Sequence, residues 1–167
     1  MEPDRATSEL WVALHELRDA LRVLALTVEE DHPSTRAVPE PVERAVGDVA
    51  DLLGDANEAI AAAAIAVGAG PVAAGDALRR CQRRLAVLGR RLDDGLGAPD
   101  RLDDLATVAR ERGGAWRAWR GGVIDGVGRV RHSLWEALSL LAERATHDRD
   151  HGEPAPCSSR RTDGVEQ

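Results

Sequence analysis

The chain contains no lysine, no phenylalanine and no tyrosine, and its few aromatic residues are all tryptophans. Its 22 basic residues are therefore all arginines, whose forked guanidinium groups suit paired hydrogen bonds to carboxylates. The abundance of Ala, Gly, Val and Asp that accompanies the missing residues is typical of proteins from GC-rich bacterial genomes. We therefore expect a bacterial protein whose polar contacts depend on arginine.

Cysteine and long apolar runs are also scarce. The two cysteines lie far apart, Cys81 on an apolar helical face and Cys157 in a polar segment, so we expect reduced thiols and no disulfide framework. The longest uncharged stretch, 59–75, is mostly alanine and is interrupted by glycine and proline, which predicts no membrane span. The acidic first residues do not form a secretory signal, and we expect a cytoplasmic protein.

The overall composition bounds the class of protein. A chain of 167 residues with 43% hydrophobic and 31% charged residues is typical of one globular domain. The net charge of −7 argues against nucleic acid and anionic membranes as main partners.

The chain is rich in apolar residues that recur at alternating spacings of four and three, which is the pattern of helices packed side by side. The row in the first stretch consists of Leu10, Leu14, Leu17, Leu21, Leu24 and Val28. Connectors with proline or glycine separate four such stretches. The predicted helices cover residues 7–30, 42–67, 71–93 and 100–144. Pro71 is expected in the first turn of the third helix, and Asp100 is expected to cap the fourth.

Short connectors place consecutive helices side by side in opposite directions. We therefore predict an all-α protein, an antiparallel four-helix bundle in up-down-up-down order, over residues 1–146. Residues 147–167 are predicted to form a disordered tail because they are polar and show no apolar period. The long fourth helix contains the pairs Gly113-Gly114 and Gly121-Gly122. We predict that it is continuous, because its apolar row survives both pairs; the alternative is a break at one of them.

Small residues recur every fourth position in this fourth helix, at Gly114, Ala118, Gly122 and Gly126. They form one row on a helix, and each glycine costs about 1 kcal/mol relative to alanine. Close packing against this row is the expected compensation. Either another helix of the same bundle or a partner helix occupies the resulting groove.

The first and fourth helices carry more apolar surface than one core face requires. The surplus residues are Trp11 and Leu26 on the first helix, and Trp135 and Leu138 on the fourth. This surplus indicates either a broad core or a contact surface for a partner or a second copy, with Trp135 as its anchor.

Arg112 is the single charged residue on a predicted apolar row, beside Trp116 and Trp119. A buried arginine needs a carboxylate partner, so this region predicts a buried ion pair or an anionic ligand. If the helix breaks at Gly113-Gly114, Arg112 is instead a solvent-exposed terminal residue.

The third helix carries a dense group of arginines between residues 79 and 91, whereas the second is acidic. Pairing of the two helices along their edges is the main interpretation. Contact of the arginines with nucleic acid, phosphate or an acidic protein partner is the alternative.

No recognised catalytic or metal-binding pattern is present. Glu29 and His32 match one half of a di-iron motif without the second half, and there is no phosphate loop or Cys-x-x-Cys motif. We expect no enzyme activity, no cofactor and no metal. The predicted function is a protein-interaction module, an adaptor or regulatory subunit of a bacterial cytoplasmic complex or a homo-oligomer. The alternative is a small-ligand sensor that uses Trp116, Trp119, Gly122 and Arg112.

Overall fold

The structure is a computed structural model that describes residues 5–34 and 37–151, with side chains up to Thr146. The described residues form five helices and no strand, which confirms the all-α prediction. The helices are α1 (Arg5–Glu29), α2 (Glu40–Gly68), α3 (Pro71–Asp94), α4 (Pro99–Arg112) and α5 (Gly114–His151).

The predicted fourth helix is two helices, so the prediction of four helices with a continuous fourth is wrong. The break lies at Gly113, whose φ of 100° and ψ of −161° are open to glycine and strained for other residues. Its N–H donates to the carbonyl of Ala109 and closes α4 at 3.1 Å. The second glycine pair, Gly121-Gly122, lies inside α5. The alternative of a break at Gly113-Gly114 is therefore the correct one.

A short joint of residues 95–98 separates α3 from α4. Gly97 is required there because a Cβ atom would lie 2.7 Å from the Leu92 carbonyl oxygen and 2.7 Å from Nη2 of Arg131. Arg131 on α5 donates to the Gly97 carbonyl and to Asp93, both at 3.1 Å. A single α5 side chain thus ties the joint to the end of α3.

A proline lies in the first turn of each of the helices α2, α3 and α4, as was predicted for Pro71. Asp100 does not cap α4, because Ala98 occupies the cap position and Asp100 lies in the first turn. An acidic residue in the first turn still favours the helix through its dipole.

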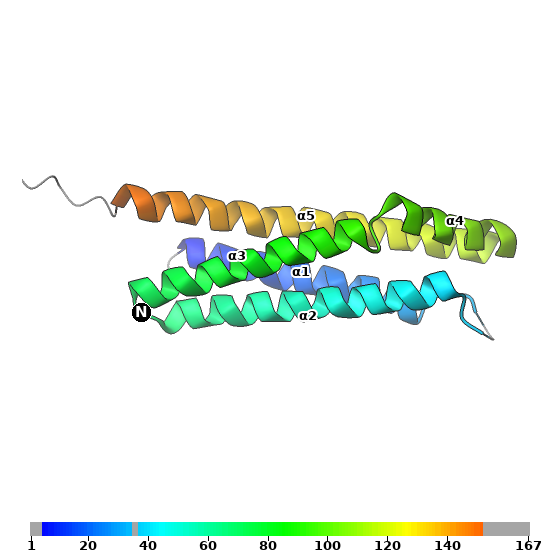
Figure 1. Cartoon of the computed structure of the whole chain (residues 1–167), viewed down its shortest axis with the longest axis horizontal. Helices are drawn as coiled ribbons and strands as arrows, with labels where there is room; N and C mark the ends of the chain where they lie inside the picture. The colour runs from blue at the N-terminus through cyan, green and yellow to red at the C-terminus, as the bar shows by residue number, and fades with distance from the viewer. Residues whose placement is uncertain (1–4, 35–36, 152–167) are drawn as a thin grey trace, which may run out of the picture.

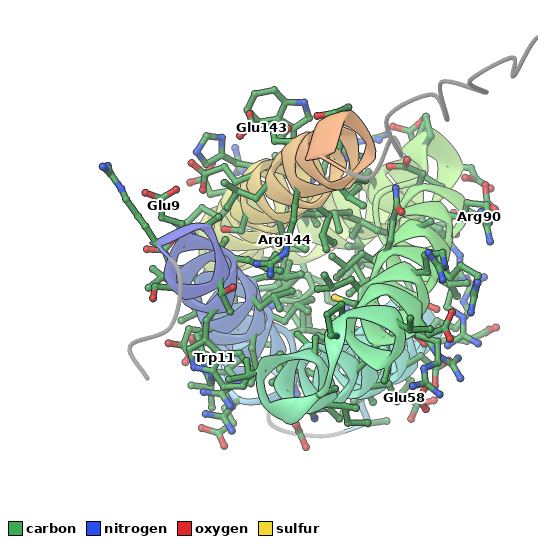
Figure 2. All side chains as sticks on the ribbon, turned by 90° about the vertical axis from the view of Figure 1, so that its left-hand side faces the viewer. Glu9, Trp11, Glu58, Arg90, Glu143 and Arg144 are labelled. Carbon is green, nitrogen blue, oxygen red and sulfur yellow. The ribbon has the colours of Figure 1, made fainter. Side chains whose placement is uncertain are left out.

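The four long helices lie side by side along the long axis of the molecule (Figure 1). α1 packs against α2 and α5, and α3 packs against α2 and, at far fewer points, against α5. Viewed from the end, α1 and α3 lie on opposite sides of the interior (Figure 2). The shorter α4 packs on α5 and on α2.

The predicted apolar rows form the core, except that the buried face of α2 is rotated by one residue at several positions of its predicted row. All six residues of the α1 row are buried, as predicted. In α2, Val46, Leu53 and Ile60 are only half-buried, whereas the preceding residue in each case is fully buried. These preceding residues are Ala45, Leu52 and Ala59.

The C-terminal boundary differs from the prediction. The α5 backbone is helical to His151, beyond His147, where the tail was predicted to begin. The rest of the predicted tail, residues 152–167, lies outside the described residues. Within the described part of the chain, none of the helices combines the length and apolarity needed to cross a bilayer.

Candidate interaction surface

The second half of the row of small residues on α5 is covered by α1. A Cβ atom on Gly126 would lie 2.8 Å from Cδ1 of the buried Leu24, and one on Gly122 would lie 3.4 Å from Cγ2 of Thr27. Gly114 and Ala118, at the start of α5, are exposed. At Gly122 and Gly126 the groove is therefore occupied by α1, a helix of the same chain, and not by a partner helix.

The indoles of Trp116 and Trp119 are buried beside this groove. Trp119 Nε1–H donates to the Thr27 carbonyl at 2.7 Å, and the two indole rings pack edge to face at 5.5 Å. His32 from the α1–α2 connector stacks on Trp116 at 6.3 Å. These contacts hold α5 against α1 and its connector.

Arg112 does not form the predicted buried ion pair. It is exposed at the end of α4, and its guanidinium carbon lies 5.4 Å from the centre of the Trp116 ring, within range of a cation–π contact. Because the helix ends at Gly113, Arg112 is a terminal residue that solvent can reach. Arg112, Trp116 and Trp119 do lie together, as the sequence predicted.

The other predicted surface residues are not in one patch. Trp11 is half-buried on the side of α1 that faces α2 (Figure 2), beside Ala63 and Ala66. Leu26 is 51% exposed on α1. Trp135 on α5 is 66% exposed, and Leu138, one turn later, is half-buried.

The arginines of α3 divide into paired and unpaired groups. Arg84 pairs with Glu58 at 2.7 Å and Arg91 pairs with the buried Asp55 at 3.0 Å, both on α2. The predicted edge pairing of α2 and α3 is confirmed for these two. Arg79 pairs with Asp76 of its own helix.

Three α3 arginines are left without such a partner. Arg80, Arg83 and Arg90 are exposed, and no carboxylate of the described residues lies within 4.0 Å of them. Figure 2 shows Arg90 on the outer side of α3, away from the interior. The outer side of α3 is therefore locally basic in a protein whose net charge is −7.

A hollow of about 320 Å³ lies between the first half of α3 and the last turns of α5. Leu78, Arg79 and Gln82 line it from α3, and Leu141 and Arg144 line it from α5. Arg144 also reaches across the end of the molecule and donates to the hydroxyl of Thr7 on α1 (Figure 2). The sequence did not predict this hollow, because spacing along one helix does not show how closely two helices approach.

A second hollow, of about 460 Å³, lies between α2 and α3 beside the joint and has charged walls of both signs, including Asp48, Arg90 and Arg101. Asp48 lies 3.6 Å from Arg101, but its buried Oδ2 accepts no hydrogen bond. Burial raises the pKa of Asp48, an effect that the neighbouring Arg101 opposes and Asp51 reinforces. The acids in this wall make it a poor anion site.

Reactive groups are sparse in the interior. Asp55 is the only buried charged residue among those described, and burial raises the pKa of the Cys81 thiol to about 11, which keeps it protonated and unreactive. No group of three His, Cys, Asp or Glu in the described ranges could hold a metal ion.

Comparisons with models of protein families, with curated proteins and with solved structures find no match to this chain. Its function therefore has to be inferred from the residues and their geometry.

Proposed function

We propose that this chain is a non-enzymatic protein-interaction module, an adaptor or regulatory subunit of a bacterial cytoplasmic complex. In this proposal the four long helices form an up-down-up-down scaffold and α4 is an added cap. The order of colours along the helices in Figure 1, which reverses from one long helix to the next, supports that scaffold.

The exposure of Trp135 carries the proposal. Removing an indole from water is among the larger gains available to a contact surface, and tryptophan is enriched among the residues that dominate binding energy. The Trp135 indole is 66% exposed in the isolated chain, so its apolar surface is still available to be buried by a partner. Leu26, 51% exposed on α1, supplies a second apolar point for a partner or a second copy.

The small-ligand sensor is the second candidate. It is favoured by the exposed guanidinium of Arg112 over the face of Trp116, where an anion would be held against an aromatic surface. The contacts of Trp119 with Thr27 and of Trp116 with His32 already occupy much of this region. The interaction module is therefore the better supported function.

Affinity capture from the native host tests the module. The intact chain, Trp135→Ala and the control Ile65→Ala, which removes a 54% exposed apolar side chain from α2, serve as baits. We expect proteins that the intact chain and Ile65→Ala retain and that Trp135→Ala loses. Light scattering at high micromolar concentration separates self-association from a foreign partner. Identical proteins on all three baits, with a monomer in solution, would contradict the proposal.

A further inference from the structure

Among neighbouring long helices, α3 and α5 contact each other at the fewest points, along the α3–α5 edge of the molecule. The two helices meet near the joint, where a Cβ atom on Gly89 would lie 3.3 Å from Leu134 and where Arg131 pairs with Asp93. Toward the start of α3 they separate around the 320 Å³ hollow. A groove between two helices is a common binding site for a third helix.

The α5 border of this edge is apolar. Arg131 and Ala145 both face α3, since one pairs with Asp93 and the other lines the hollow. Trp135, Leu138 and Ala142 fall between them at spacings of four and three, so they lie on the same side of α5. The exposed indole thus borders the groove.

The α3 border combines small and basic residues. Arg79 and Gln82 line the hollow, and Arg83 and Ala86 follow Arg79 at spacings of four and three, which places them on the same side of the helix. Ala86 is small and half-buried, whereas at Gly89 the border closes against Leu134 of α5. Arg83 is exposed and has no carboxylate partner among the described residues.

We propose that the α3–α5 edge, made of Arg79, Gln82, Arg83, Ala86 and Gly89 on α3 and of Trp135, Leu138, Ala142 and Ala145 on α5, binds an amphipathic helix of a partner protein with an acidic flank. The apolar face of that helix lies on Trp135 and Leu138, and its carboxylates pair with Arg83, whose guanidinium has no carboxylate partner among the described residues. This inference rests on the proposed function and names the chemistry of the partner.

Charge and shape favour this occupant over two others. A second copy would bring the acids of its α2, but four of these six acids are already paired within the chain, which leaves Glu43 and Asp51. A nucleic acid would meet an indole and aliphatic side chains where it needs cations, and the chain's net charge of −7 would repel it. An acidic amphipathic helix satisfies both borders at once.

Selection from a phage-displayed library of helical peptides against the full chain tests the inference. We expect enriched peptides with large apolar residues at helical spacing and an excess of Asp and Glu. The affinity of a labelled enriched peptide is then measured by fluorescence anisotropy, and we expect it to weaken as salt is raised, since exposed charges are screened.

Two substitutions on the edge have matched controls. Trp135→Ala should weaken peptide binding by about tenfold or more, while Ile65→Ala leaves it unchanged. Arg83→Glu should weaken it by about fivefold or more. Arg22→Glu makes the same charge change at an exposed position of α1, which lies across the interior from α3. It should change affinity by less than about twofold. Circular dichroism confirms that each variant is folded.

Several results would overturn the inference. These are enrichment of neutral or basic peptides, equal effects of Arg83→Glu and Arg22→Glu, or tighter binding of a DNA duplex than of any peptide at physiological salt. A dimer in solution that Arg83→Glu dissociates would assign the edge to a second copy instead. If a partner captured from the host is lost with Trp135→Ala but retained with Arg83→Glu, the acidic-helix inference fails and the proposed function stands.

Discussion

Asp48 shows how burial and pairing compete at a single residue. Its carboxylate lies 3.6 Å from Arg101, yet its buried Oδ2 accepts no hydrogen bond, and desolvation outweighs the attraction of the guanidinium. The result is a raised pKa, so the folded state binds this proton more tightly than the unfolded state does. Although Asp48 and Arg101 lie close enough to be called an ion pair, their proximity therefore does not offset the cost of burying the charged form of Asp48.

This raised pKa predicts an unusual pH dependence. The stability that protonated Asp48 contributes is present below its ordinary pKa of 3.8 and is lost as the pH rises through the higher pKa of the folded state. Asp48→Asn has no charge to desolvate, so its melting temperature relative to the unsubstituted chain should rise between about pH 3 and pH 7. Thermal unfolding followed by circular dichroism at several pH values measures this difference.

Asp103→Asn serves as the control, because it makes the same substitution at an exposed position. An Asp48→Asn variant that instead becomes relatively less stable toward neutral pH would show that the attraction of Arg101 exceeds the cost of burial.

At the scale of elements, the contact of α5 with α1 depends on the small residues of α5. The closest approach is at Gly126, where the space that a methyl group would need is taken by the buried Leu24. Two residues later, Gly128 is exposed and nothing lies within 4 Å of its Cβ position. The same helix therefore offers one glycine held by packing and one that is not.

Alanine at these two positions should have opposite effects. Gly128→Ala should stabilise the protein by up to about 1 kcal/mol through helix propensity. Gly126→Ala gains the same propensity but should be destabilising overall, because overpacking a close-packed core costs about 1–3 kcal/mol. Chemical denaturation of both variants gives the comparison. If both stabilise the protein equally, α1 does not pack against α5 at Gly126.

Spacing in the sequence predicts each element only where one apolar row stands out. The α1 row is made of leucines and a valine at unbroken spacings of four and three, and all of it is buried. In α2, alanines at 45 and 59 compete with the larger Val46 and Ile60, and the smaller residues are buried because they allow the helices a closer approach. The break at Gly113 depends on a positive φ, which spacing does not reveal.

At the scale of the whole molecule, stability is not expected to be uniform. The helix α4 buries three side chains, Leu105, Val108 and Ala109, and packs only on α5 and α2. Glycine lies at both of its ends, in the joint to α3 and at Gly113. Few buried apolar contacts characterise segments that open without global unfolding.

Hydrogen exchange followed by mass spectrometry should therefore separate α4 from the long helices. We expect amides in the middle of α4 to exchange well before those in the middle of α1, which buries seven side chains. Exchange of both helices at one rate would instead show a single cooperative unit.

The charges of the sequence predict part of the assembly. The pairs of Arg84 with Glu58 and of Arg91 with Asp55 join helices that follow each other in the chain, so opposite charge on consecutive helices was enough to predict them. The predicted third and fourth helices were expected side by side, but the hollow between α3 and α5 was not predicted, because spacing along one helix does not show how closely two helices approach. Trp135 was predicted as an anchor; the arginines beside it were not linked to it.

The unequal shielding of the tryptophans gives the molecule an optical property. Trp116 and Trp119 are each 5% exposed and Trp11 is half-buried, whereas Trp135 is 66% exposed, so an aqueous collisional quencher acts mainly on Trp135. With no tyrosine in the chain, ultraviolet emission comes from indoles alone. The protein thus carries an intrinsic fluorophore at the border of the α3–α5 groove, where a change in emission reports coverage of that border without any attached dye.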